Sequence, residues 1–325
     1  MALRADEMID RRQLRRKLTF WRVLAFAVAA IAVVGAAVMW FDGEIGARAV
    51  DHIAKVRIEG TITEDEELME RLTKLRETAA VKGVILSIDS PGGTTAGGEA
   101  IFDEVRRLAA AKPVVAQVGT LAASAGYMIA SATDHIVARK SSILGSIGVL
   151  VQFPNISGLM DKLGVTLDEI KSSPLKAEPS PFNPTTEPER AMMRAMVLDS
   201  YDWFVGLVDE RRPLSRAEVV ALADGSVFTG RQALQRKLVD SLGGELEAVK
   251  WLESKGVAPK LEVVEWEPER RGSSFLFGKA MARLGSLFGI GASDGNILSE
   301  IGADRIFLDG LVSVWQPDTS SSHAK

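Results

Sequence analysis

Strand-like and helix-like patterns alternate along residues 52–153, and this alternation restricts the possible fold more than any other feature of the sequence. Apolar residues at every second position indicate a half-buried strand, whereas leucines three and four residues apart indicate an amphipathic helix. The expected elements are, in order, strand His52–Ile62, helix 64–78, a strand from 83 that runs into the double glycine at 92–93, helix 97–111, strand 114–118, a short helix from about 124, strand His135–Ala138 and an extended stretch over 143–153. Strands joined by helices lie parallel and are connected by right-handed crossovers. The sequence therefore predicts an α/β fold, built on a parallel sheet with flanking helices.

The chain becomes irregular before a long helix. Residues 171–186 hold four prolines and little apolar periodicity, which indicates a segment without regular structure. A long helix is expected over Glu187–Arg211, because Pro188 and neighbouring glutamates stand in its first turn, as helix starts favour. Shorter helices are expected over 215–223 and 230–237.

An uncharged apolar run of nineteen residues, 23–41, stands near the N-terminus. As a helix it would extend about 28 Å, which is enough to cross the hydrocarbon core of a bilayer. Six basic residues stand just before the run and two acidic residues follow it: Arg11, Arg12, Arg15, Arg16, Lys17, Arg22, Asp42 and Glu44. By the positive-inside rule, the N-terminus stays cytoplasmic and the chain beyond residue 42 is exported. We therefore expect a single-pass anchor with the rest of the chain on the exported side; in a bacterium this would be the inner (cytoplasmic) membrane, with residues beyond 42 on its periplasmic side.

Two other interpretations of the apolar run stay open. It could be a cleaved signal peptide with an Ala-x-Ala site at 47–49, or a buried core helix. Its length exceeds the roughly 7 to 15 apolar residues of a signal peptide, and the one-sided charge does not suit a core helix. Both observations favour the anchor.

The composition excludes several classes of function. The chain has no cysteine, which excludes disulfides, thiolate nucleophiles and cysteine-based metal sites. A formal net charge of -4 gives no general reason to bind nucleic acid. With three histidines and no Walker or dinucleotide glycine pattern, the sequence predicts no metal and no cofactor.

A serine and a double glycine follow two neighbouring strands of the predicted sheet. Gly92 and Gly93 end the strand that starts at 83, and Ser124 follows the next strand. Ligands of open α/β sheets bind at the carboxyl ends of the strands, so we expect these residues to share one crevice. Ser124 starts a short helix among small residues, where the helix dipole and free N–H groups favour developing negative charge. The N–H groups of Gly93 and Ala125 are the expected oxyanion donors.

Each of these motifs alone has an ordinary structural explanation. A serine in a small-residue turn is commonly a helix N-cap, and Ser-Pro-Gly-Gly is commonly only a turn. His135 could be the base, but it starts the next strand and is expected at the opposite end of the sheet. Asp89 could be a triad acid, although an aspartate at a strand end is commonly a turn or cap residue. The joint placement of Ser124 and the double glycine favours a catalytic site.

Four motifs in this order resemble the short, single-domain form of signal peptide peptidase A: IDSPGG, LAASAGYMIASATDHIVA, ILGSIGVL and DGSVFTGRQALQRKLVDSLGG. The resemblance covers residues 52–250 and implies a fold similar to those of the Clp protease subunit and the crotonases. It also implies a serine peptidase with a Ser/Lys dyad. By motif position, the resemblance assigns the nucleophile to Ser124, the general base to Lys176 in SSPLKAEPSP, and the hydroxyl that orients the lysine to Ser146. A ring-like homo-oligomer, an octamer whose lysines reach the serines of neighbouring subunits, is implied as well.

A lysine can act as a base only where its pKa is lowered. An exposed ammonium group has a pKa of about 10.4, and removal from water can lower that value by several units. Lys171 is the main rival of Lys176. The family position favours Lys176, because Lys171 falls on the IKS stretch before the motif.

The expected organisation has five parts. They are a basic cytoplasmic N-terminus (1–22), the transmembrane anchor (23–41), a linker (42–51), the peptidase domain (52–260) and a C-terminal amphipathic segment with a tail (261–325). Apolar residues at helical spacing over 273–291 could rest on the bilayer surface or pack against the core. Residues 306–317 could form a docked strand or an intersubunit tail.

The function expected from these features is a membrane-anchored serine endopeptidase. It would hydrolyse remnant signal peptides and other hydrophobic peptides on the exported side of the membrane. Two alternatives of the same fold are a crotonase-like acyl-CoA enzyme, in which backbone amides polarise a thioester, and a catalytically silent membrane scaffold.

Overall fold

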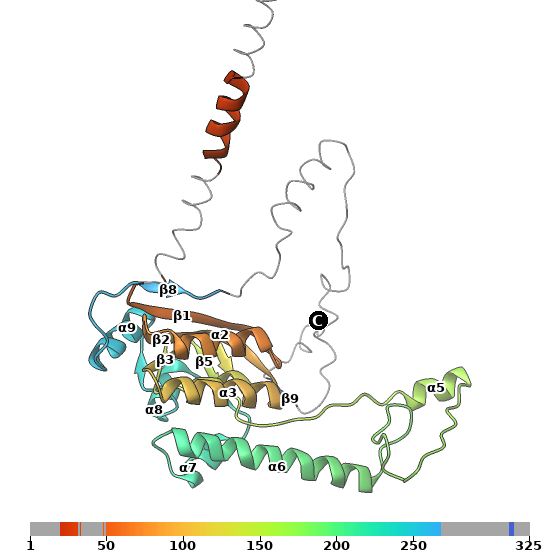
Figure 1. Ribbon diagram of the computed structural model, residues 1–325. Coiled ribbons are helices and arrows are strands. Elements are labelled where there is room, and N and C mark those ends of the chain that lie inside the picture. The colour runs from red at the N-terminus through yellow and green to blue at the C-terminus, as the bar shows by residue number, and fades with distance from the viewer. Residues whose placement is uncertain (1–19, 32, 34–47, 49, 268–311, 315–325) are drawn as a thin grey trace, which may run out of the picture. The chain divides into compact units, whose positions relative to one another are not determined.

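The computed structural model describes residues 20–31, 33, 48, 50–267 and 312–314 (Figure 1). Contacts between Cα atoms divide the chain into two units, Met1–His52 and Ile53–Lys325. The amphipathic segment expected over 273–291 lies outside the described residues, and the domain boundaries given above stay predictions.

The N-terminal unit contains a helix. Residues 20–31 and 33 are helical, and their apolar side chains are exposed. Within the described residues, no helix is both long enough and apolar enough to cross a membrane. The anchor expected over 23–41 continues past residue 33 into residues that are not described.

Within the described residues, nine strands form one sheet. They are β1 (His52–Ile62), β2 (Val81–Thr94), β3 (Val114–Ala123), β4 (His135–Ala138), β5 (Ile143–Gly145), β6 (Val227–Thr229), β7 (Ser241–Leu242), β8 (Val263–Glu265) and β9 (Val312–Val314). The main path runs β6-β5-β3-β2-β1-β8, with β4 between β3 and β7 and with β9 paired to β2. Most pairs are parallel, as predicted, but β6 lies antiparallel to β5 and β9 lies antiparallel to β2. The sheet is therefore mixed, which corrects the expectation of a purely parallel one.

Eight helices are described in the second unit. They are α2 (Glu66–Glu77), α3 (Thr95–Ala109), α4 (Ala125–Ser131), α5 (Ser157–Leu163), α6 (Glu187–Arg211), α7 (Arg216–Leu222), α8 (Gly230–Gln235) and α9 (Glu245–Ser254). Their order confirms the strand-helix alternation expected from the sequence. The predicted extended stretch over 143–153 shrinks to the three residues of β5, because the chain leaves the sheet after Gly145.

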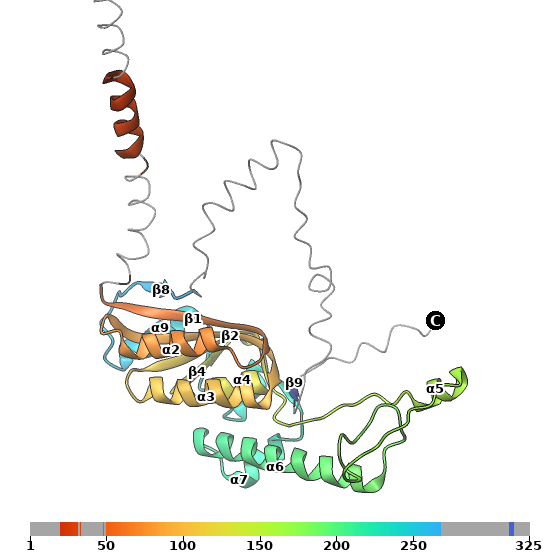
Figure 2. The same ribbon diagram turned by 45° about the vertical axis from the view of Figure 1, so that its right-hand side comes forward.

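Both faces of the sheet are covered, because the central strands β2 and β3 carry buried apolar side chains on both faces. Val84 and its neighbours on one face join the core under α2, α3 and α4. Ile85 and its neighbours on the other face pack against Ala248 and Leu252 of α9. Figures 1 and 2 show α2 and α3 side by side on the first face. Parallel strands with such continuous apolar runs need helices on both sides, and this chain supplies them.

Residues 150–186, which we call the arm, connect β5 to α6 and contain α5. Figures 1 and 2 show the arm running out from the sheet. Helix α6 links the arm to the core, because Phe204 and Val208 in its C-terminal half are fully buried, whereas Met196 and Leu198 nearer its start are exposed.

Candidate active site

The double glycine lies in a tight bend at the end of β2, and Ser90 holds that bend. The Ser90 hydroxyl donates a hydrogen bond of 2.7 Å to the carbonyl oxygen of Gly60 and accepts one of 3.1 Å from the N–H of Gly92. Gly92 has a φ of +106°, in the region that favours glycine. A Cβ on Gly93 would stand 1.7 Å from the carbonyl oxygen of Ile62. The bend therefore requires glycine and keeps its backbone in a fixed position.

Ser124 occupies a strained position between β3 and α4. Its φ of 57° and ψ of -119° are rare for a residue with a side chain. The hydroxyl does not cap the helix, which excludes the ordinary N-cap explanation. Ala125, one of the expected oxyanion donors, is the first residue of α4. Backbone strain of this kind is concentrated at functional sites.

The structure brings Ser124 to the bend. β2 and β3 are neighbouring parallel strands, with Ser90 in register with Ala122. A Cβ on Gly126 would stand 2.9 Å from the carbonyl oxygen of Ser90, so the start of α4 lies directly against the bend. The expected oxyanion donors and Ser124 therefore stand at the same edge of the sheet, as the sequence predicted.

Ser146 leaves the sheet beside Ser124. Ala123 of β3 is in register with Gly145 of β5, so Ser124 and Ser146 follow paired residues of adjacent parallel strands. Ser146 also has a positive φ, 51°, and its N–H donates a hydrogen bond of 2.7 Å to the carbonyl oxygen of Ser226. Two serine hydroxyls thus belong to this edge.

Lys176 is not brought to Ser124 within one chain. Its side chain is exposed on the arm, and its backbone N–H donates to the carbonyl oxygen of Ser173 at 3.2 Å. The arm is also closed on itself by a hydrogen bond of 2.8 Å from the N–H of Ile156 to the carbonyl oxygen of Pro181.

Lys171, the rival base, is paired with carboxylates. Its ammonium group contacts Glu169 and Glu178, and the hydrogen bonds to these two groups raise the pKa of Lys171 above its ordinary value. A general base at neutral pH needs a lowered pKa. The raised pKa of Lys171 is therefore the opposite of what a general base requires.

His135 lies at the other end of the sheet, as expected. It starts β4 in register with Val115, near the start of β3, whereas Ser124 follows the end of β3. Its Nε2 is 2.9 Å from the hydroxyl of Ser241, and its ring stacks on Trp251. It cannot reach Ser124 as a base.

Asp89 faces the backbone of β3. Its carboxylate accepts hydrogen bonds from the N–H groups of Thr120 and Leu121 at 3.3 and 3.1 Å. Asp89 therefore binds the backbone of β3 and does not act as a triad acid. Nothing in the sequence indicated this contact beyond the position of Asp89 before the bend.

The outer edge of the bend carries β9. Gly92, Gly93 and Thr94 are in antiparallel register with Val314, Ser313 and Val312. Two roles were left open for residues 306–317, and the described part of this stretch, residues 312–314, is a docked strand. This edge therefore accepts an extended segment beside the expected oxyanion donors.

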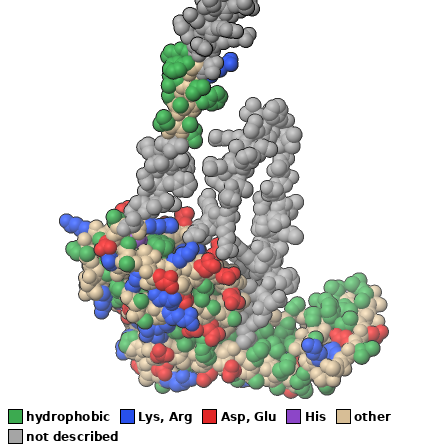
Figure 3. Space-filling view, viewed as in Figure 1, with side chains coloured by type: hydrophobic (Ala, Val, Ile, Leu, Met, Phe, Trp, Pro, Cys, Tyr) green, Lys and Arg blue, Asp and Glu red, His purple; other side chains and the backbone are tan. Residues whose placement is uncertain are grey.

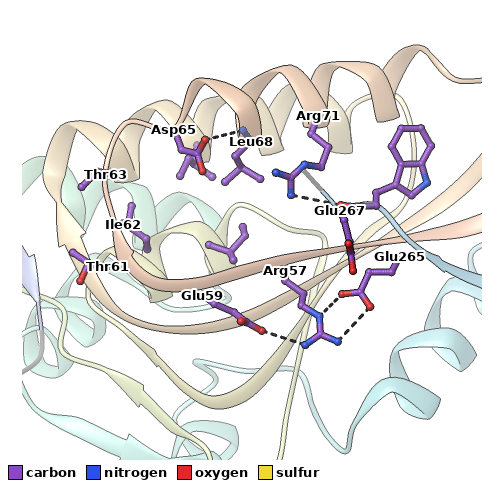
Figure 4. Close-up of a pocket in the computed structure, with 13 residues that line it drawn as sticks. Arg57, Glu59, Thr61, Ile62, Thr63, Asp65, Leu68, Arg71, Glu265 and Glu267 are labelled. Atoms are coloured by element: carbon purple, nitrogen blue, oxygen red, sulfur yellow. Dashed lines mark hydrogen bonds and ion pairs between the residues drawn. The ribbon is translucent and has the colours of Figure 1, made fainter. Parts of the chain in front are cut away.

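A pocket of about 610 Å³ lies elsewhere, between β1, the start of α2 and residues 265–267 (Figure 4). Arg57 stands between Glu59 and Glu265 there, and Arg71 donates a hydrogen bond to the backbone of Trp266. None of the expected catalytic residues lines this pocket.

Comparisons with known proteins bear on the activity. The model of peptidase family S49 matches residues 106–258, and the Clp protease model matches residues 48–144. A candidate protease of Methanocaldococcus jannaschii is 39% identical over 227 residues, which are 70% of this chain and 71% of that protein. Protease 4 of Haemophilus influenzae is 37% identical over 61% of this chain and 34% of its own length. A candidate signal peptide peptidase SppA of Enterococcus faecium is 35% identical over 66% of this chain and 63% of its own length.

Proposed function

The chain belongs to peptidase family S49 and is a serine peptidase, and from this premise we propose that Ser124 and Lys176 form its catalytic dyad. The observation that supports Ser124 most strongly is its strained backbone at the start of α4, directly against the double-glycine bend. A nucleophile needs oxyanion donors within reach, and the N–H groups of Gly93 and Ala125 are the proposed donors on this edge.

The proposed reaction has two steps. The Ser124 hydroxyl attacks the scissile carbonyl, while the neutral amine of Lys176 takes its proton. The N–H groups of Gly93 and Ala125 stabilise the oxyanion, and the protonated lysine then gives its proton to the leaving amine. Water hydrolyses the acyl-enzyme by the same route in reverse. Ser146 orients the lysine through its hydroxyl.

Lys176 comes from a neighbouring copy of the chain in this proposal. The arm that carries it projects from the core and exposes many apolar side chains (Figure 3). Among them are Leu159, Leu163, Val165, Leu167, Ile170 and Leu175. Contiguous exposed apolar surface of this kind marks protein contacts, and the site of one chain is incomplete without a second lysine-bearing arm. A homo-oligomer, which the family resemblance suggests is an octameric ring, would cover this apolar surface and would bring a lysine to each serine.

The contact between subunits also explains how Lys176 becomes a base. An exposed ammonium group stays protonated at neutral pH. Burial of the arm against a neighbour would take the amine out of water and disfavour its charged form. Oligomerisation and activation of the base are then the same event.

The proposed substrates are extended, hydrophobic peptides, including remnant signal peptides. The pairing of β9 with Gly92–Thr94 supports this, because a peptide that added to the same edge would place its backbone beside Gly93. A short apolar peptide in an extended conformation could pair its backbone groups with such an edge.

Anchoring in the membrane is a further part of the proposal. Phe20, Trp21, Phe26 and Ile31 are 63 to 77% exposed on the N-terminal helix, a surface that is unfavourable in water and suits lipid. The basic residues before the helix support an orientation with the peptidase domain on the exported, periplasmic side of the inner membrane. Recovery of the full-length protein in the soluble fraction of cells would contradict this part.

The two alternatives are less well supported. Membership in a peptidase family argues against an acyl-CoA enzyme, although backbone amides at a bend would also suit a thioester. A silent scaffold has no need of the strained backbone at Ser124.

The test is hydrolysis of a synthetic signal peptide, followed by mass spectrometry of the fragments. Wild type is expected to release defined fragments, whereas Ser124→Ala and Lys176→Ala release none. Ser131→Ala, in the same helix, is the matched control with wild-type activity. Normal hydrolysis by either dyad variant would remove that residue from the mechanism.

A further inference from the structure

Strand β3 contains an irregularity a short distance before Ser124. Val118 is in register with Ile88 of β2, and Ala122 is in register with Ser90. One residue of β2 therefore lies opposite three residues of β3, and residues 119–121 form a bulge with two extra residues.

The bulge is also the point where the strand that pairs with β3 on the side away from β2 changes. Up to Val118, β3 pairs with β4, and from Leu121 onward it pairs with β5. The bulge thus separates the part of β3 that belongs to the sheet core from the part that leads to Ser124.

Two side chains hold the bulge from opposite sides. On the β2 side, the Asp89 carboxylate accepts the N–H groups of Thr120 and Leu121 at 3.3 and 3.1 Å. On the β5 side, the buried hydroxyl of Ser142 donates a hydrogen bond of 2.6 Å to the carbonyl oxygen of Gly119 and accepts the N–H of Arg139 at 3.0 Å.

Gly119 allows the bulge to sit this close to Asp89. A Cβ on Gly119 would stand 3.0 Å from the nearer carboxylate oxygen. At a bulge, the neighbouring strand cannot accept hydrogen bonds from these two adjacent N–H groups. The Asp89 carboxylate accepts both, so it stabilises the backbone and does not take part in the reaction.

We propose that Asp89 and Ser142 are positioning residues, which clamp the bulge of β3 and thereby set where Ser124 stands relative to the double-glycine bend. The proposal rests on Ser124 being the nucleophile. Two extra residues at about 3.3 Å each correspond to roughly 6 to 7 Å of travel along β3. Relaxing the bulge would move Ser124 by part of that distance, away from the N–H of Gly93.

The consequence is measurable because catalysis is sensitive to small displacements. A shift of about 1 Å in a reacting group can cost about 100-fold in rate. We expect Asp89→Ala to lower kcat by about 10- to 100-fold, with a change in KM of less than about threefold. Asp89→Asn keeps one acceptor oxygen and should recover part of the loss, and Ser142→Ala should lower kcat by a smaller factor.

The experiment uses the full chain and measures three quantities for each variant. They are kcat and KM for a synthetic signal peptide, the rate of covalent modification by a small fluorophosphonate, and the unfolding midpoint in urea. Ser87→Ala is the matched control: it lies on the same strand and face, two residues earlier, and its hydroxyl contacts Gln117 and not the bulge. It should keep wild-type kcat and modification rate.

A positioning role predicts that kcat and the modification rate fall together in folded protein. A purely structural role predicts a lower unfolding midpoint with unchanged kcat for each titrated active site, and that result overturns the proposal. If Asp89→Ala fails to fold, Asp89→Asn and Ser142→Ala decide by the same criterion. If Ser124→Ala is modified at the wild-type rate, the nucleophile is misassigned. If Ser124→Ala is not modified but the Asp89 variants keep wild-type kcat and modification rate, only the positioning role of Asp89 is refuted.

Discussion

The backbone N–H of Ser124 donates a hydrogen bond of 2.8 Å to the carbonyl oxygen of Gly145. The bond ties the junction of β3 and α4 to the last residue of β5, and Ser146 follows directly. The backbone of Ser124 is thus held in place through its own N–H group. The same bond couples the positions of the two serines at this edge.

Gly93→Ala tests whether the bend needs glycine. The new Cβ would stand 1.7 Å from the carbonyl oxygen of Ile62, so the backbone must move. We expect the free energy of unfolding to fall by about 3 kcal/mol and the peptidase activity to be lost. Gly158→Ala on α5, where a Cβ meets nothing within 4 Å, is the control and should be neutral or slightly stabilising. Equal stability of the two variants in urea titrations would disprove the close contact.

Replacing each of the two lysines of the arm tests which of them is the general base. The carboxylates of Glu169 and Glu178 raise the pKa of Lys171, so this group stays protonated and cannot act as a base. We expect Lys171→Met to keep kcat within about threefold, and Lys176→Met to lose at least about 100-fold. Peptide hydrolysis at neutral pH measures both, and the reverse order of the two effects would contradict the assignment.

His135 should make stability depend on pH. Burial lowers the pKa of His135, Arg212 and Lys255 act in the same direction, and Asp240 opposes them. The unfolded chain then binds more protons than the folded protein at a pH just below about 6.5, so stability falls as the pH drops through that window. Urea titrations at several pH values should show a smaller fall for His135→Gln than for wild type. Parallel curves for the two proteins would mean that His135 does not contribute.

Removal of β9 tests the peptide-binding edge. Because β9 pairs with Gly92–Thr94, it competes with any peptide that uses the same backbone groups. Deletion of residues 312–325 should lower KM for the peptide by several-fold and leave kcat unchanged, since more of the protein is then competent to bind. Deletion of 318–325, which keeps β9, is the control. An unchanged or higher KM in the longer deletion would show that substrates bind elsewhere.

Much of the fold follows from local pattern. The alternation in His52–Ile62 and the leucine spacing after it predict β1 and α2, because both elements bury one face. The start of the long helix at Glu187 is predicted correctly, because Pro188 and the neighbouring glutamates mark it, and its end near Arg211 agrees as well. The antiparallel strand β6 was missed, and for β9 a docked strand was only one of two expected roles, because such three-residue strands depend on tertiary contacts and not on periodicity.

The site was predictable only where its chemistry lies in one motif. The joint position of Ser124 and Gly93 follows from strand order, which the sequence reveals. The bulge held by Asp89 could not be foreseen, because its partner N–H groups belong to the backbone of another strand. The placement of Lys176 depends on a second chain, about which the periodicity of one sequence carries no information.

Mixing Ser124→Ala protein with Lys176→Ala protein tests the dyad most directly. Each variant alone should be inactive. After the subunits are exchanged in equal amounts, about a quarter of the sites combine an intact serine with an intact lysine from the neighbouring copy, so hydrolysis of the signal peptide should return to about a quarter of the wild-type rate. Mixed oligomers that form but stay inactive, or activity in either variant alone, would contradict a serine and a lysine that meet across a subunit interface.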